Sequence, residues 1–202
     1  MTIYRPVSII LRMKDTKSKF IDAAVHLIEE QGYHATGLSQ IIKRSGAPKG
    51  SLYYHFPDGK EELAAAAVQQ AADKLVSLIE ENVSDTLPIA EAIRDFVLGV
   101  ASGVEMTNFQ SGGPLTAVAM ETATTSERLN LACREAFSQI IAAFSKKLVD
   151  AGVSSTKADQ LAVFITASIE GGIILSRTNH SGKPLRQVAE QLYTMMKDTE
   201  KL

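Results

Sequence analysis

The sequence has no tryptophan and a single cysteine, Cys133, among 202 residues, and aromatic side chains make up only 6%. A lone cysteine excludes an intramolecular disulfide and is typical of a reducing cytoplasm. No apolar run looks long enough to span a bilayer, and the chain lacks repeats, low-complexity tracts and glycine-rich phosphate loops. Abundant alanine and leucine with few aromatic residues favour an all-α fold.

Charge is distributed unevenly, although the formal net charge is only −2. Residues 1–60 hold nine Lys/Arg against five Asp/Glu, whereas residues 61–202 hold twelve against eighteen. A basic N-terminal quarter on an acidic body is expected of a small DNA-binding unit attached to a separate partner domain. Charge alone is equally compatible with a solvated basic surface.

The stretch from Thr36 to Glu62 predicts two short helices and a tight turn, followed by the start of a long helix. Ser45-Gly46 breaks the first short helix, and Pro48 suits the first position of the second. On that second helix Leu52 and Phe56 are four residues apart and face inward together. The opposite side carries a cation, a glycine and two phenols, a pattern that suits a helix lying in a nucleic-acid groove.

The run Gly50-Ser51-Leu52-Tyr53-Tyr54-His55-Phe56, with Lys60 after it, resembles the recognition helix of the TetR family of bacterial repressors. The segments 20–24 (FIDAA) and 32–36 (GYHAT) match the first helix of that family and its exit. The segments APKGSLYYHFPDGKEELA, GGPL and SIEGGIILS resemble its lincomycin-resistance and flavonoid-responsive (LmrA/YxaF-like) branch.

The resemblance implies a helix-turn-helix DNA-binding domain over residues 1–60, including an N-terminal arm, and a helical ligand-binding and dimerisation domain over 61–202. It implies a homodimer on a palindromic operator in double-stranded DNA, released by a small-molecule effector, with no membrane association. The DNA-binding candidates are Thr36, Gly37, Ser39, Gln40, Lys49, Gly50, Ser51, Tyr53, Tyr54, His55 and Lys60. Pro48 stands where many relatives carry Ser or Thr, so the phosphate contact of that hydroxyl does not carry over.

Apolar periodicity predicts further helices over 60–82, 89–106, 115–123, 126–151, 157–177 and from Pro184 onward. Capping boxes are expected at Asp58/Glu61 and Thr156/Asp159, and side-chain caps from Thr36 and Ser126. By resemblance, an effector pocket is lined by Phe96, Val100, Met106, Phe109, Leu115, Met120 and Phe137, with Asn108, Gln110 and Glu121 as polar candidates. Taken singly, each of these residues is also typical of ordinary core.

Two apolar helices with surplus surface suggest a four-helix interface across a dimer. The residues expected there are Ile140, Phe144, Ile165, Ile169, Gly172 and Ile173. Paired glycines at 171–172 are expected where two backbones approach closely, since each glycine in a helix costs roughly 1 kcal/mol relative to alanine.

Two other classes of function were weighed against a repressor. An enzyme is disfavoured, because no nucleophile–base arrangement or metal-ligand cluster is visible, no cofactor is implied, and Cys133 lies on a buried helical stripe. The alternative is a small-molecule-binding or protein-interaction dimer without specific DNA binding, for which Pro48 is the only hint.

Overall fold

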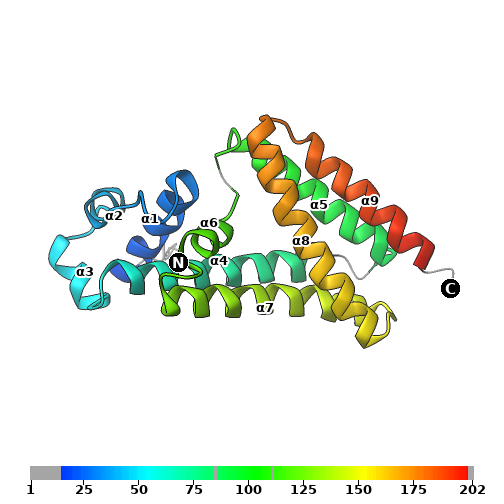
Figure 1. Cartoon of the computed structure of the whole chain (residues 1–202), viewed down its shortest axis with the longest axis horizontal. Coiled ribbons are helices and arrows are strands. Elements are labelled where there is room, and N and C mark those ends of the chain that lie inside the picture. The colour runs from blue at the N-terminus through cyan, green and yellow to red at the C-terminus, as the bar shows by residue number, and fades with distance from the viewer. Residues whose placement is uncertain (1–14, 84–85, 111, 200–202) are drawn as a thin grey trace, which may run out of the picture.

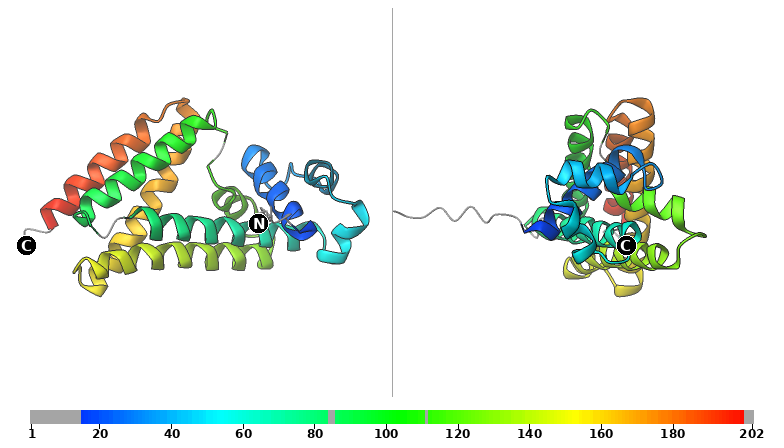
Figure 2. Two further views of the ribbon diagram at one scale, coloured as in Figure 1. Left: turned by 180° about the vertical axis from the view of Figure 1, so that it is seen from behind. Right: turned by 90° about the vertical axis from the view of Figure 1, so that its left-hand side faces the viewer.

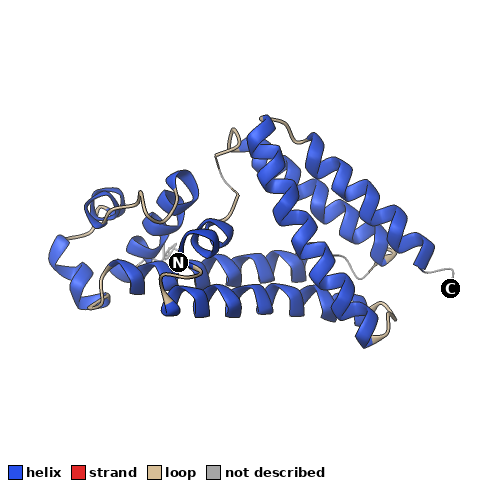
Figure 3. Cartoon of the chain, viewed as in Figure 1, coloured by secondary structure: helices blue, strands red, loops and turns tan. Residues whose placement is uncertain are grey.

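The computed structural model describes residues 15–83, 86–110 and 112–199. Over these ranges the chain forms nine α-helices and no strand, which confirms the all-α prediction (Figures 1 and 3). The N-terminal arm expected over residues 1–12 lies outside the described residues. The helices are α1 (Thr16–Gln31), α2 (Leu38–Ser45), α3 (Lys49–His55), α4 (Lys60–Asn82), α5 (Ile89–Met106), α6 (Pro114–Thr122), α7 (Glu127–Asp150), α8 (Ser155–Asn179) and α9 (Lys183–Thr199).

Helices α1, α2 and α3 gather around the beginning of α4 at one end of the molecule (Figure 1). Their shared core contains Phe20 of α1, Leu52 of α3, Phe56 directly after α3 and Leu63 of α4, all no more than 1% exposed. The rings of Phe20 and Phe56 meet edge to face, with centroids 6.5 Å apart, a favoured geometry for aromatic pairs. We call α1–α3 the N-terminal unit.

Four of the remaining helices form two long pairs joined by α8, and the short α6 packs against α1, α4 and α7. Helices α4 and α7 run side by side from the N-terminal unit, and α5 and α9 form the second pair (Figures 1 and 2). Two contacts show that α4 and α7 run in the same direction. Ser126 bonds to Glu61 near the start of both helices, and Gln69 donates to Gln139 at 2.8 Å further along both. Helix α8 packs on α7 at its beginning and continues along α9.

Gly172 allows α8 and α9 to approach closely. A Cβ atom at this position would lie 2.8 Å from Cδ2 of Leu185, closer than carbon atoms pack. Gly172 therefore makes room for a side chain of the neighbouring helix in the same chain, and the close approach of two backbones expected at the glycine pair stays a prediction. Gly171, by contrast, faces open space.

By length and composition α8 is the one helix in the described part of the chain that could cross a membrane, with a mean hydropathy of 1.4 over its most apolar window. The sequence analysis expected no apolar run long enough to span a bilayer, and α8 meets that criterion by length and composition. It packs against α7, α5 and α9, as the core helix of a globular body does, while four large apolar side chains remain exposed on its outer side: Val163, Phe164, Ile174 and Leu175.

The helix boundaries agree closely with the sequence, whereas several predicted caps are wrong. Ser126 accepts from Leu129 N–H at 3.1 Å as expected. Asp58 instead pairs with Arg128, and Gly59, the residue before α4, supplies no side-chain cap. Asp159 accepts from Ser145 at 2.6 Å rather than capping α8. In both predicted capping boxes the aspartate side chain bonds instead to a residue of α7, Arg128 or Ser145.

Candidate nucleic-acid interface

The turn between α2 and α3 is fixed by its own residues. Gly46 adopts the left-handed conformation (φ 64°), and Ser45 Oγ accepts from Ala47 N–H at 3.2 Å. Pro48, with φ −61°, precedes α3 without supplying a side-chain cap. Because Ile41 of α2 and Leu52 of α3 are both buried, the rotation of α3 about its axis is determined by the core.

That rotation leaves one side of α3 open to solvent. Tyr53 is 52% exposed and Tyr54 82% exposed, and Lys49 and Gly50 lie on the same exposed surface. His55 is half-buried, with its ring edge to face against Tyr54 at 5.0 Å. Ser51 is half-buried and donates to the backbone oxygen of Pro48 at 2.7 Å. Because Tyr53 and Tyr54 are largely exposed, they contribute little to the core and are available to bind a partner.

Thr36 does not match its predicted role. It is 1% exposed, and its hydroxyl donates to the backbone oxygen of Gly32 at 2.7 Å. The residue that precedes α2 is Gly37, whose N–H donates to Gln40 Oε1 at 2.8 Å. The hydroxyl is therefore occupied by the end of α1 and is not presented to a phosphate.

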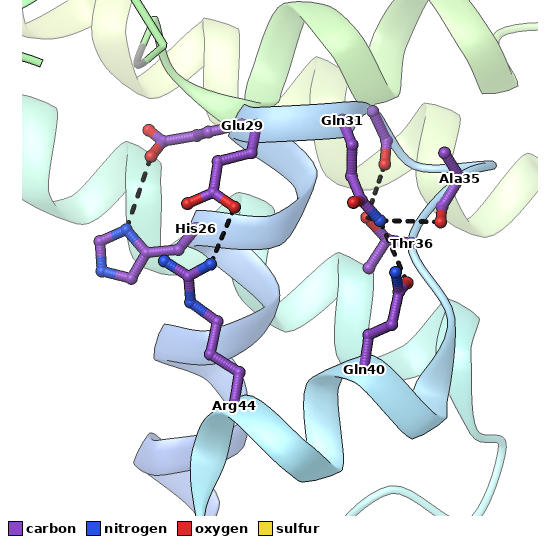
Figure 4. Close-up of polar contacts among 9 residues, drawn as sticks. His26, Glu29, Gln31, Ala35, Thr36, Gln40 and Arg44 are labelled. Atoms are coloured by element: carbon purple, nitrogen blue, oxygen red, sulfur yellow. Dashed lines mark hydrogen bonds and ion pairs between the residues drawn. The ribbon is translucent and has the colours of Figure 1, made fainter. Parts of the chain in front are cut away.

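Gln31, at the end of α1, is a residue that sequence reasoning missed. Its side-chain nitrogen donates to Ala35 O at 2.8 Å and to Gln40 Oε1 at 3.1 Å, and it lies 3.5 Å from Thr36 Oγ1 (Figure 4). These contacts fix the start of α2, where Ser39 and Gln40 remain exposed. One turn further along α2, Arg44 forms an ion pair of 2.8 Å with Glu30 of α1 (Figure 4).

Lys60 is held against the segment that joins α1 to α2, residues 32–37, which we call the 32–37 turn. Its ammonium nitrogen lies 4.2 Å from the ring centroid of Tyr33 and 3.4 Å from the backbone oxygen of His34. Burial lowers the pKa of Lys60 from its usual value, while the nearby carboxylate of Glu121 opposes that shift. Lys60 is thus an ordered cation at the start of α4 and not a freely solvated one.

The seven residues predicted for an effector pocket are placed unequally. Phe96 and Leu115 are buried, and Val100, Phe109 and Phe137 are half-buried. Met106 and Met120 are 88% and 76% exposed, so neither lines an enclosed cavity in this conformation. Met106 is the last residue of α5, and Met120 is on the outward face of α6.

Buried polar groups near this region come from α8 and α6. Glu170 of α8 accepts a hydrogen bond from Thr116 of α6, and burial raises the pKa of Glu170. Glu121, predicted as a polar residue of the pocket, instead reaches the 32–37 turn. Cys133 is buried, which raises its pKa to about 11; it remains a thiol at neutral pH.

The six residues predicted for a dimer interface all lie inside one chain. Ile140, Phe144, Ile165, Ile169, Gly172 and Ile173 are buried, none more than 9% exposed. Helix α8 is apolar on more than one side, so periodicity could not separate the face that contacts α7 and α9 from the outer face that carries Phe164 and Leu175. Over the described ranges, no group of His, Cys, Asp or Glu could hold a metal.

Comparison with known proteins accounts for both halves of the chain. Residues 20–67 match the family described as bacterial regulatory proteins, tetR family, and residues 89–191 match the LmrA/YxaF-like C-terminal domain of transcriptional regulators. The chain belongs to the TetR family. It is therefore a helix-turn-helix transcriptional regulator.

Two full-length relatives come from Bacillus subtilis (strain 168). The uncharacterised HTH-type transcriptional regulator YxaF is 42% identical, with 91% of this chain and 96% of YxaF covered. The HTH-type transcriptional regulator LmrA is 38% identical, with 91% and 97% covered. In fold, the chain resembles a TetR transcriptional regulator from Legionella pneumophila, with a TM-score of 0.80 at 22% identity, covering 92% of this chain and 99% of the other.

Proposed function

We propose that this TetR-family chain is a dimeric, sequence-specific repressor that acts in the cytoplasm and leaves a palindromic operator when a small apolar or aromatic effector binds. Residues 1–60 serve as the DNA-binding domain and residues 61–202 as the effector and dimerisation domain. The observation that carries the proposal is the exposed surface of α3, where Lys49, Tyr53 and Tyr54 are held rigidly by the buried Leu52.

The candidate residues take two roles, and Lys49 takes part in both. Base reading falls to the surface residues of α2 and α3: Gly37, Ser39, Gln40, Lys49, Gly50 and Tyr53. Phosphate contacts fall to Lys49, Tyr54, His55 and Lys60, which supply affinity without sequence information. Thr36 is left out because its hydroxyl is buried, and Ser51 acts through its bond to Pro48.

The exposed apolar face of α8 and α9 supports a dimer. A groove of about 590 Å³ runs between these helices, lined by Phe164, Ser168, Leu175, Pro184, Gln187, Val188, Gln191, Leu192 and Met195. None of these side chains is charged, as in the centre of an interface between two copies of a chain. Two N-terminal units related by a twofold axis would then meet successive major grooves, about 34–36 Å apart.

The effector is assigned to the space around the buried and half-buried residues Phe96, Val100, Phe109, Leu115 and Phe137, which suit an apolar or aromatic molecule. An effector that favours a different arrangement of α6 relative to the N-terminal unit shifts the population away from the conformation that binds the operator.

The experiment is a random-site selection with the purified full-length chain, followed by sequencing of the bound DNA. The proposal predicts enrichment of a palindrome whose half-sites are centred about one helical turn, or a multiple of it, apart. Failure to enrich any sequence over the starting pool would contradict it and favour a dimer that does not bind DNA specifically.

A further inference from the structure

Glu121, near the end of α6, holds the 32–37 turn directly. Its two carboxylate oxygens accept from the backbone N–H groups of Tyr33 and His34, at 3.2 and 2.7 Å. Its backbone oxygen lies 3.2 Å from Nε2 of His34. A Cβ atom on Gly32 would collide with this carboxylate, and Gly32 itself has φ 83°. The turn is thus shaped to receive Glu121.

The same two residues of the turn hold Lys60. The ring of Tyr33 and the backbone oxygen of His34 are the two groups that contact the Lys60 ammonium. Glu121 therefore bonds to the backbone N–H groups of Tyr33 and His34, the same two residues whose ring and backbone oxygen contact Lys60. Helix α6 is in turn tied to the body by the bond from Thr116 to Glu170 of α8. Polar contacts thus link α8 to α6, α6 to the 32–37 turn, and the turn to Lys60.

We propose that Glu121 is a positioning residue for operator binding: it fixes the 32–37 turn, and the turn holds the Lys60 ammonium where a DNA phosphate takes it up. The part of this inference that concerns DNA, the contact of Lys60 with a phosphate, rests on the proposed function. A lysine that is already ordered loses less conformational freedom on binding than one that is mobile in solution. A displacement of α6 would reach Lys60 by the same contacts.

A double-mutant cycle with Glu121→Gln and Lys60→Ala tests this on operator DNA. Glu121→Gln removes the negative charge and replaces one of the two accepting oxygens by an NH2 group, which cannot accept, but leaves Lys60 able to reach phosphate. We expect operator binding to weaken by about two- to tenfold, the effect of having to order one long side chain, with an unchanged salt dependence. Glu135→Gln makes the same charge change at an exposed position of α7 and should leave binding as in the wild type.

Measuring Glu121→Gln in a Lys60→Ala chain shows whether its effect on operator binding passes through Lys60 or through a general loss of stability. In a Lys60→Ala chain the further change Glu121→Gln should have no effect on operator affinity, because the side chain that it positions is gone. An equal loss in both backgrounds would overturn the inference, since the loss would then not pass through Lys60. Unchanged or tighter binding by the single variant Glu121→Gln would overturn it as well.

Amide hydrogen exchange tests the first half of the inference without DNA. In Glu121→Gln the Tyr33 and His34 amides should exchange faster than in Glu135→Gln, whereas the Phe56 amide, which donates to Leu52 at 2.8 Å within the N-terminal unit, should not change. Equal exchange of the turn amides in both variants would overturn the inference. If the wild-type chain fails to bind any operator, the proposed function fails, and the exchange result still decides on the turn.

Discussion

Arg177 of α8 bonds to Glu29 of α1, joining the body of the protein to the end of its first helix. One guanidinium nitrogen donates to the backbone oxygen of Glu29 at 3.2 Å, and another donates to that of Phe109 at 3.2 Å. The last turn of α1 contains no basic residue of its own, so Arg177 supplies the positive charge that favours a helix C-terminus. The N-terminal unit is thus attached to the body through α8 as well as through α4 and α6.

Replacing Arg177 should destabilise the fold. Arg177→Met keeps most of the apolar stem but leaves two carbonyl groups without their donor, and hydrogen bonds to charged groups contribute about 1.5–3 kcal/mol each. We expect the free energy of unfolding, measured in urea, to fall by about 3 kcal/mol, the lower end for two such bonds. Arg134→Met, at an exposed position of α7, is the matched control. Equal midpoints and slopes for the two variants would contradict this role for Arg177.

Lys60→Ala should weaken binding to every DNA sequence by a similar factor. Removing one phosphate contact lowers the slope of log affinity against log salt by roughly one unit. Anisotropy titrations at several salt concentrations measure that slope on operator and on unrelated DNA. Lys146→Ala, on the exposed side of α7, controls for the loss of one charge. A slope equal to that of the control would argue against a phosphate contact.

Tyr53→Ala should reduce operator affinity by about 1–3 kcal/mol while leaving nonspecific binding nearly unchanged, as expected for a side chain that reads base edges. Tyr53 is 52% exposed, so the melting temperature should change little. Competition between operator and unrelated DNA gives the specificity ratio. A parallel loss on both DNAs would assign Tyr53 to the backbone instead.

Phe164→Glu should convert the protein to monomers. This side chain is 51% exposed on the outer face of α8 and lines the apolar groove, and a buried charge there would lack a partner in a dimer. Sedimentation velocity measures the mass. Leu131→Glu makes the same kind of change at a residue of α7 that is 44% exposed and should remain dimeric. Dimers in both variants would place the interface elsewhere.

Glu170→Gln should stabilise the protein at neutral pH more than at low pH. Burial raises the folded-state pKa of Glu170 above its ordinary value of 4.5. The folded state therefore binds the proton more tightly, and the stability contribution of this group is lost as the pH rises from about 4.5 through the raised value. Glutamine is neutral throughout and still accepts the bond from Thr116.

Thermal unfolding at pH 4.5 and pH 7 measures the difference. A gain of about 1 kcal/mol would raise the Tm by roughly 2–4 °C for a chain of this length. The difference in Tm between wild type and variant should shrink at pH 4.5. The same Tm difference at both pH values would show that the ionisation of Glu170 has no part in the effect.

The sequence predicted most helix boundaries because their signals are local. Apolar periodicity and the break at Gly46 lie within a few residues of the elements they define, and α4 and α5 begin and end where periodicity placed them. The exposed residues of α3 follow from the same logic, since the inward positions of Leu52 and Phe56 determine which side is left open.

The contacts between distant segments were not predictable in this way. Glu121 lies 87 positions after His34, and Arg177 lies 148 positions after Glu29; no short-range pattern pairs them. Asp58 and Asp159 carried local cap signals that a tertiary partner overrode. The exposed side of α8 was not predictable from periodicity either, because apolar residues lie on more than one side of that helix and its burial depends on which neighbours pack against it.

The most direct test of the account is an anisotropy titration of the full-length chain against DNA from its own upstream intergenic region. It is run at two salt concentrations with excess nonspecific competitor. A dimeric repressor should show saturable, competitor-resistant binding at about two protomers per site, and this binding should weaken as salt rises. Binding that disappears with competitor, on this DNA and on sequences taken from the random-site selection alike, would contradict it.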